Sequence, residues 1–386
     1  MAAPSPEELR REFLLDPEVV FLNHGSFGSC PRPVFERYHA WQRELEAEPI
    51  DFIDRRLPDL LDAAREALAE YVGASAQDFA FVQNATTGVN IAARSLALGP
   101  GDEVLATDLE YGACDLAWEW VCRRAEARYV RAPIPLPLRD PGEVVDALFA
   151  HADERTRAVY VSHVTSVTGL VLPLAEIVAR ARSRGLVTIV DGAHAPGHVP
   201  VNLAELGADY YAGNAHKWLG APKGTGFLHV RPEHQDRVDA AIVSWGYAEG
   251  STFSQRIEMQ GTRDFAAWLT VPDAIRFQAE RDWEAVRDRS RRLTRDARAE
   301  LCELLRTEPL APDSMLSQMA AVRLPRSAPG LSERLFTDHR VEIPVGGPED
   351  DLLRLSVAGY TARADVDRLL TALARELDAE HGQQDE

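Results

Sequence analysis

The feature that most constrains the fold is a regular alternation of short apolar segments with amphipathic ones between about residues 21 and 217. Each apolar segment has five or six residues, is rich in Val, Tyr, Phe or Ile, and is apolar almost throughout. Such runs are typical of strands buried on both faces. The predicted strands are Asp78–Gln83, Glu103–Asp108, Arg128–Ala132, Ala158–His163, Val187–Asp191 and Asp209–Gly213.

The segments between these strands have the apolar spacing of helices, as in Leu57–Val72, Asp115–Ala127 and Leu174–Gly185. Gly185 is well suited to end the last of them, because glycine readily adopts the backbone conformation of a helix C-cap. Alternating strands and helices predict an α/β fold with a mostly parallel sheet that is covered on both faces. Phe227–Val230 follows a Gly-rich turn and is predicted to be one further, antiparallel strand.

After Phe265 the chain changes to long charged helices and a few strands, which indicates a second, smaller α+β unit. We therefore predict a large domain over residues 21–264 and a small domain over residues 265–386. Residues 1–20 are predicted to belong to the small domain. The polar tail His381–Glu386 is expected to fray. The elements predicted for the small domain are helices Pro272–Glu280, Trp283–Leu305 and Arg363–Ala379 and strands Met319–Leu324 and Leu352–Val357.

Charge and composition restrict the possible partners. The chain has 42 basic and 61 acidic residues and a net charge of −19. This charge argues against a protein that binds nucleic-acid duplexes or anionic membrane surfaces. It has no run of 18 apolar residues, and its first residues lack the pattern of a signal peptide. The four cysteines lack metal-site spacing and are expected to stay reduced. These features predict a cytoplasmic protein that acts on small molecules.

Polar signals follow several of the predicted strands, where ligands bind in open α/β sheets. Asn84-Ala85-Thr86-Thr87 opens a helix, where free N–H groups attract an anion, although Thr also caps helices routinely. Asp191 ends a buried strand, where it either pairs with a cation or caps a turn. Lys217 ends another strand and is one of only two lysines, but it could be an ordinary surface lysine. Tyr111 follows the predicted strand Glu103–Asp108 and places an aromatic ring at the same edge of the sheet.

Together these signals fit pyridoxal phosphate (PLP). This cofactor needs an anion-binding turn, a lysine that forms a Schiff base, an acid against its ring nitrogen and an aromatic plate. Each signal alone is weak, whereas the ordered set is specific.

Several longer blocks carry a resemblance to a known family. The chain resembles the class V aminotransferase family of fold type I PLP enzymes over almost its whole length and, within it, the branch of isopenicillin N epimerases. The resemblance implies a large domain with a mostly parallel seven-stranded sheet and a smaller α+β domain. The blocks are Phe21–Gly28, Glu48–Phe52, Asn84–Thr87, Ser162–Val164, Val190–Gly197, His216–Leu219, Glu258–Asp264 and Leu353–Ser356.

The resemblance implies a role for each matching residue. Lys217 would bind the cofactor and move the Cα proton, Asp191 would pair with the ring nitrogen, and Arg354 would hold the substrate α-carboxylate. Thr262 would reach the phosphate of the neighbouring subunit, which implies a homodimer with a shared active site. Asn23, His24 and Tyr247 would contact substrate. The remaining cofactor contacts implied are Thr86, Thr87, Asn214 and His216 at the phosphate, Tyr111 as the stacking plate, and His194 and Ser166 near the phenolic oxygen.

The reaction itself stays open between several alternatives. Epimerisation at the Cα of an amino acid or aminoacyl group is the leading interpretation. Elimination by a C–S lyase of the ergothioneine-pathway type and transamination are alternatives, whereas a cysteine desulfurase is disfavoured because His339–Gly347 contains no cysteine. Two other classes are weaker. A metal site at His194 and His198 is opposed by the intervening Pro196 and Gly197, and a non-catalytic scaffold would not need this residue set.

Overall fold

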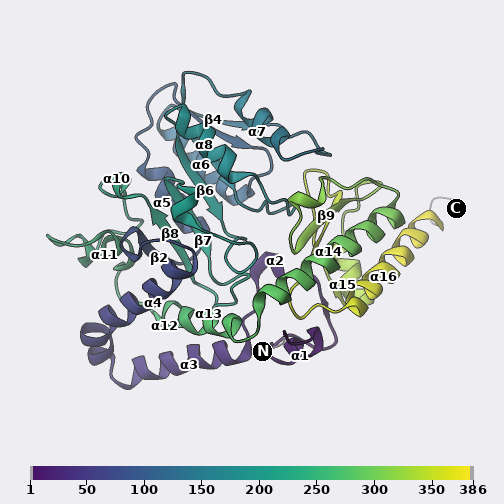
Figure 1. The fold of residues 1–386 in the computed structure, drawn as a ribbon, viewed down its shortest axis with the longest axis horizontal. Coiled ribbons are helices and arrows are strands. Elements are labelled where there is room, and N and C mark those ends of the chain that lie inside the picture. Colours follow the sequence, from purple (N-terminus) through teal and green to yellow (C-terminus); the bar gives the residue numbers. More distant parts are fainter. Residues whose placement is uncertain (1–2, 383–386) are drawn as a thin grey trace.

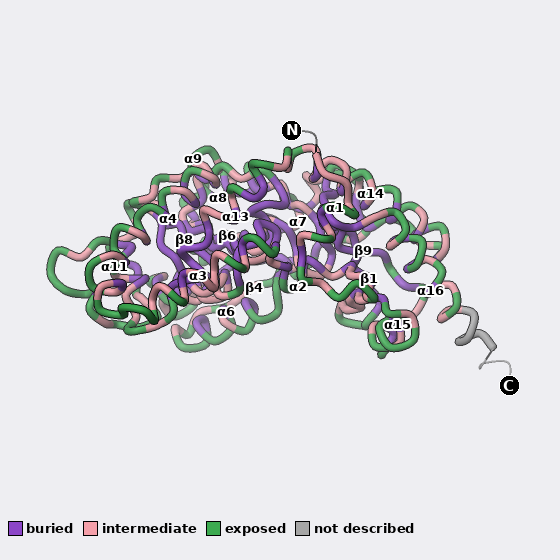
Figure 2. The backbone as a smooth tube through the Cα atoms, turned by 90° about the horizontal axis from the view of Figure 1, so that it is seen from below, coloured by how far each residue is buried: buried purple, intermediate pink, exposed green. Residues whose placement is uncertain are grey.

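The computed structural model describes residues 3–382 and shows two units side by side. The large unit contains a seven-stranded sheet, and the smaller one contains the helices α14, α15 and α16 (Figure 1). The short helix α2 (His24–Phe27) lies at the junction of the two units in Figures 1 and 2. The last part of the predicted frayed tail, residues 383–386, lies outside the described residues.

The large sheet confirms the predicted α/β fold. Its strand order is β2-β8-β7-β6-β5-β3-β4, and only β8 runs antiparallel to its two neighbours. The predicted bounds of its seven strands lie within two residues of the observed ones. The strands are β2 (Phe79–Val82), β3 (Glu103–Thr107), β4 (Arg128–Ala132), β5 (Thr156–Ser162), β6 (Val187–Gly192), β7 (Tyr210–Asn214) and β8 (Gly226–Val230).

Side chains of the strands alternate between two cores, one on each face of the sheet. Phe79 and Phe81 point into one core, whereas Ala80 and Val82 of the same strand point into the other. The first core is packed by α4 (Leu57–Tyr71), α7 (Gly142–Phe149), α8 (Leu174–Ser183) and α13 (Val271–Ala279). The second is packed by α5 (Ala85–Ser95), α6 (Gly112–Arg124) and α11 (Phe253–Glu258). Burial on both faces explains why the strands are apolar throughout.

Helix α6 differs from its prediction, which placed it at Asp115–Ala127. It starts three residues earlier, at Gly112, and ends at Arg124. Asp115 lies in its first turn and accepts a hydrogen bond from the Tyr129 hydroxyl at 2.6 Å instead of capping the helix. Glu126 has a φ of 55°, so the helix cannot continue to Ala127.

The smaller unit combines two small sheets with three long helices. Its antiparallel sheet has the order β11-β12-β9, and a parallel pair joins β1 near the N-terminus to β10. The helices α12 (Ala266–Leu269) and α13 pack on α3 (Arg32–Ala47) and α4 of the large unit, so the division at residue 264 stays a prediction. The elements are β1 (Val20–Phe21), β9 (Met319–Arg323), β10 (Val341–Glu342), β11 (Val345–Gly346), β12 (Leu352–Ser356), α14 (Trp283–Leu305), α15 (Leu331–His339) and α16 (Arg363–Gly382).

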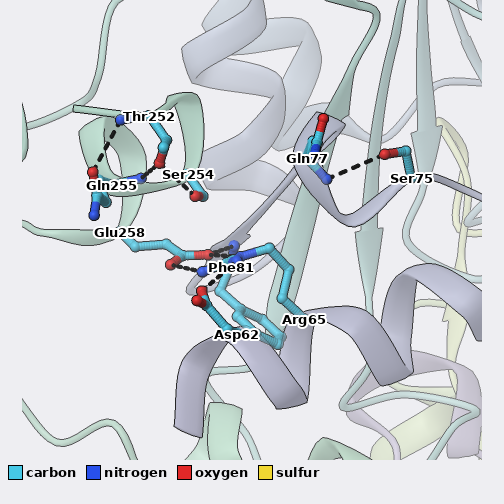
Figure 3. A network of polar contacts seen from close by, with 9 residues as sticks. All are labelled: Asp62, Arg65, Ser75, Gln77, Phe81, Thr252, Ser254, Gln255 and Glu258. Carbon is cyan, nitrogen blue, oxygen red and sulfur yellow. Dashed lines mark hydrogen bonds and ion pairs between the residues drawn. The ribbon is translucent and has the colours of Figure 1, made fainter. Parts of the chain in front are cut away.

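A buried ion pair ties α11 to the large unit (Figure 3). Glu258 accepts hydrogen bonds from Nε and Nη2 of Arg65, each at 3.1 Å, and from the backbone N–H of Phe81 in β2 at 2.8 Å. Because both charged groups are buried, removing Arg65 would leave the Glu258 carboxylate without a cation, whereas Arg65 also pairs with Asp62 at 2.8 Å. The pair therefore fixes the start of the segment 258–264, which carries Thr262.

Within residues 3–382, no helix has both the length and the apolar character needed to cross a bilayer. In the same part of the chain, no group of three or more His, Cys, Asp or Glu side chains is arranged to hold a metal ion.

Candidate active site

A cavity of about 170 Å³ lies at the carboxyl ends of β5, β6 and β7. The start of α5 and the start of α6 close its sides, and the end of α2 contributes Ser26 and Phe27. It brings together eight of the residues predicted from sequence: Thr86, Tyr111, Ser166, Asp191, His194, Asn214, His216 and Lys217. This convergence follows from the parallel sheet, because strands that run in one direction end at one edge.

Lys217 is partly buried beside a neutral imidazole. Its Nζ lies 3.1 Å from Nε2 of His194, and the indole N–H of Trp218 donates to Nδ1 of the same ring at 3.4 Å. A neutral imidazole carries one N–H, so its proton lies on Nε2 and points at the lysine nitrogen. Burial lowers the pKa of Lys217 to about 8 and the pKa of His194 well below its usual range. At neutral pH Lys217 is therefore a free amine, the form that attacks a carbonyl, much more often than an ordinary lysine is.

Asp191 provides a buried carboxyl group at the end of β6. One carboxyl oxygen accepts the backbone N–H of Ala193 at 2.8 Å, and the other lies 3.4 Å from the Tyr160 hydroxyl and 3.6 Å from Sγ of Cys114. Burial raises its pKa, while the nearby ammonium of Lys217 lowers it. The group suits a cationic ring nitrogen, which would supply the missing counter-charge.

The start of α5 forms a turn that is open to an anion. Asn84 caps the helix by accepting from the N–H and the hydroxyl of Thr87, and Asn214 accepts from the N–H of Ala85 at 2.7 Å. The N–H of Thr86 lies in the same first turn, so it has no hydrogen-bond acceptor within the helix. Thr86, which has an N–H and a hydroxyl to donate, lines the cavity, whereas Thr87 lies outside its lining.

His216 completes this turn through one ring nitrogen. Its Nδ1 donates to the carbonyl of Thr225 at 2.9 Å, which leaves Nε2 toward the cavity that His216 lines. The chain approaches closely here, since a Cβ on Gly28 would overlap the carbonyl oxygen of His216 and the Cα of Lys217. Gly28 also has a φ of 69°, so glycine is required on both grounds.

Arg354 is a buried cation whose hydrogen-bond partners in residues 3–382 are all neutral. Its Nη1 donates to the carbonyl of Ser166 at 2.7 Å, and its Nη2 donates to Asn23 Oδ1 at 3.0 Å and Ser26 Oγ at 2.8 Å. Its Nε has no partner in this part of the chain, and burial lowers the pKa of Arg354 to about 10. A carboxylate would supply both the missing acceptor and the missing charge.

Six predicted contacts do not line this cavity, namely Thr87, Arg354, Asn23, His24, Tyr247 and Thr262. His24 lies behind Lys217, where its Nε2 donates to the carbonyl of Lys217 at 3.2 Å and its Nδ1 accepts from the Tyr360 hydroxyl at 2.8 Å. Tyr247 and Thr262 are exposed on the surface of this protomer. Their roles toward substrate and the neighbouring phosphate stay predictions.

No role was predicted for Glu110, which is 5% exposed next to the predicted plate Tyr111. Its carboxyl group accepts from the Thr107 hydroxyl at the end of β3 and from the Ser162 hydroxyl at the end of β5. Burial, with smaller contributions from Asp191 and Asp115, raises the pKa of Glu110 to about 8. The carboxyl group is thus a neutral link between the two strand ends at neutral pH. A buried acid directly after a strand, as for Asp191, was the available signal.

Glu110→Gln should change how stability depends on pH. The folded protein keeps the Glu110 proton up to about pH 8, whereas the unfolded chain releases it near pH 4.5. Rising pH in this window therefore removes stability from the wild type, by at most about 1.4 kcal/mol per pH unit. Glutamine keeps the neutral shape and lacks the proton. Urea unfolding from pH 5 to pH 8 should show this loss in wild type and in the exposed control Glu205→Gln. Equal slopes in wild type and Glu110→Gln would contradict it.

Comparison with known proteins adds the family. Residues 31–369 match the family model described as Aminotransferase class-V. The chain belongs to the class V aminotransferase family. This confirms the resemblance expected from the sequence blocks. The family implies a PLP-dependent enzyme, and the cavity fits that cofactor: a lysine with a lowered pKa, a buried acid and an open helix turn converge in it.

The relatives differ in their reactions. The chain is 42% identical to isopenicillin N epimerase from Streptomyces clavuligerus, over 97% of this chain and 98% of the relative. It is 27% identical to hercynylcysteine sulfoxide lyase from Schizosaccharomyces pombe, over 70% of this chain and 71% of the relative. A structure of the cystine C–S lyase C-DES with cysteine persulfide superposes with a TM-score of 0.82 at 24% identity, covering 93% of this chain and 98% of that one, which supports the fold.

Proposed function

We propose that this protein is a PLP-dependent epimerase that inverts the Cα configuration of an amino acid or aminoacyl group. The observation that carries the proposal is the 42% identity to isopenicillin N epimerase over nearly the full length of both chains. PLP, when bound, withdraws electrons from the Cα of the attached amino acid and so makes its proton acidic.

The residues of the cavity have distinct tasks in this proposal. Lys217 holds the cofactor and then carries the Cα proton on its amine, which His194 keeps oriented through the 3.1 Å contact. Asp191 would hold the cofactor by placing its negative charge near the ring nitrogen, and Arg354 would fix the α-carboxylate. With the carboxylate held, the Cα hydrogen can be directed at the amine of Lys217.

Epimerisation also needs a proton carrier on the face of Cα away from Lys217. The sequence left Tyr111 and His24 as candidates. Both ring nitrogens of His24 are already engaged, by Tyr360 and by the carbonyl of Lys217. Tyr111 lines the cavity from the start of α6 and is 46% exposed, so its hydroxyl can exchange protons with solvent. We therefore assign Tyr111 as the proton carrier on the face of Cα away from Lys217.

Tyr111→Phe should separate proton removal from inversion. Phenylalanine keeps the aromatic plate and removes the hydroxyl, so Lys217 should still exchange the Cα proton of one enantiomer with solvent. Inversion should fall by about 10²-fold or more. NMR in deuterated water measures the exchange, and chiral chromatography of the same sample measures the inversion. Unchanged inversion in Tyr111→Phe would contradict the assignment.

The proposal includes a cytoplasmic homodimer with a shared active site. Thr262 is exposed, and Tyr247 lies in an exposed apolar loop with Ile242, Val243 and Trp245, the last of them 84% exposed. Exposed apolar side chains in such numbers suit a protein–protein contact. A second copy would cover this loop and bring its Thr262 to the phosphate turn.

The main alternative is a C–S lyase. An aminotransferase and a non-catalytic scaffold are two further alternatives. The S. pombe lyase relative favours the first of these, although it is more distant than the epimerases. Desulfurase chemistry with a cysteine nucleophile is disfavoured. None of the four cysteines lines the described cavity, and burial raises the pKa of Cys30 to about 12 and of Cys122 to about 11.

One experiment separates these reactions. The purified protein is reconstituted with PLP and incubated with L- and D-amino acids and with isopenicillin N in deuterated water. Deuterium at Cα with inverted configuration supports the epimerase. Pyruvate release establishes a lyase, and an oxo-acid product that needs an amino acceptor establishes an aminotransferase. If no visible absorbance band appears with added PLP, the protein is a non-catalytic scaffold.

A further inference from the structure

A second cavity, of about 390 Å³, opens beside the candidate active site. We call it the Phe27–Phe336 groove. It lies between the N-terminal segment that leads into β1 and the helix α15, two regions that are more than 300 residues apart in sequence and are joined by the β1–β10 pair. Figure 2 shows α2, β1 and α15 along the same side of the molecule.

The groove and the active-site cavity share a wall. Phe27 lines both, and Asn23 lines the groove while Ser26 lines the cavity. Asn23 and Ser26 both accept from Nη2 of Arg354. The guanidinium proposed to hold the α-carboxylate therefore lies at the border of the two spaces. A substrate fixed there has the groove within reach of its side chain.

The groove offers apolar surface to a ligand. Leu15, Val19, Phe21, Phe27 and Phe336 line it, and Phe27 and Phe336 are 74% and 37% exposed. Large apolar side chains left this open gain free energy when a ligand covers them.

The polar groups at its rim are already engaged. Glu342 accepts from Asn23 Nδ2 at 2.9 Å, Asp16 pairs with Arg340 at 3.2 Å, and Arg10 donates to the carbonyls of Asp16 and Val19. These bonds hold the walls in place, so the groove is formed before a ligand arrives.

We propose that the Phe27–Phe336 groove is a subsite for the distal part of an extended amino-acid substrate, one whose side chain ends in an apolar group. The proposal rests on the proposed function and narrows its substrate class. The side chains of alanine and cysteine are too short to reach the groove from Cα. A cavity of this volume is large enough for a ring system, whereas small sulfur amino acids would leave it empty.

Two amino acids of different reach test the subsite. The probes are L-alanine and Nε-benzoyl-L-lysine, titrated into the PLP-loaded protein while the visible spectrum reports binding. Phe336 lines only the groove, so Phe336→Ala should weaken Nε-benzoyl-L-lysine about tenfold and leave L-alanine unchanged. Leu14→Ala is the matched control, because Leu14 is 49% exposed on the same segment but does not line the groove. It should alter neither affinity.

A smaller change guards against misfolding. Phe336→Leu keeps an apolar side chain on α15 and should lose part of the same discrimination. A preference for Nε-benzoyl-L-lysine that survives both variants would overturn the subsite, as would an equal loss of affinity for both probes. A variant that changes only the oligomeric mass would assign the groove to a second copy and overturn it as well. A wild-type spectrum that responds to neither probe would overturn the proposed function, and the subsite with it.

Discussion

Lys217→Ala is expected to lower turnover by more than about 10⁴-fold, because one side chain both holds the cofactor and carries the Cα proton. The variant should also lose the visible absorbance band of lysine-bound PLP. The lowered pKa of the Lys217 amine, about 8, is the physical basis, and Nε2 of His194 contacts and orients this amine. Exchange of the Cα proton in deuterated water measures the effect, and the spectrum reports the bound cofactor independently.

The chain offers a matched control for this variant. Its only other lysine, Lys223, donates to the carbonyl of Gly28 at 3.0 Å and does not line the cavity. Lys223→Arg keeps that donor and should keep both the band and the exchange. Added methylamine should restore part of the exchange in Lys217→Ala, since a free amine can replace the missing proton carrier. Full turnover by Lys217→Ala would reject the proposed mechanism.

The sheet and the centre of the site were predictable from the sequence because their signals are local. Strands buried on both faces are apolar at every position, and the ends of parallel strands meet at one edge. Asp191, Lys217 and Thr86 each follow such a strand, so their convergence needed no knowledge of side-chain packing. The convergence of His194 and Tyr111 follows equally from their places next to these residues.

The rest depended on contacts between distant segments. The pairing of β1 with β10 and the Phe27–Phe336 groove join residues about 320 positions apart, which no local pattern encodes. The place of His24 behind Lys217 depends on Tyr360, more than 300 residues downstream. Helix α6 starts three residues before its predicted start, and Asp115 in its first turn bonds Tyr129 on the neighbouring strand β4. Tertiary hydrogen bonds decided both cases.

Asp191→Asn is expected to lower turnover by about 10²–10³-fold, because it removes a fixed charge where the cofactor ring needs one. Asparagine has the same shape, and its oxygen can still accept from the N–H of Ala193. The fold should therefore be kept, which thermal unfolding checks. Asp115→Asn removes another largely buried carboxylate, one that contacts Tyr129 and does not line the cavity, and should retain turnover.

The same substitution makes a second prediction that needs no turnover, because Asp191 and Lys217 are coupled by charge. The carboxylate of Asp191 raises the pKa of Lys217, while burial lowers it to about 8. Asp191→Asn removes the only one of these two influences that favours the ammonium form, so the pKa of Lys217 should fall further. The pH midpoint for the reaction of the cofactor-free protein with PLP should then shift downward. A midpoint that stays at the wild-type value would mean that the charge of Asp191 does not reach the amine, and that its effect on turnover arises elsewhere.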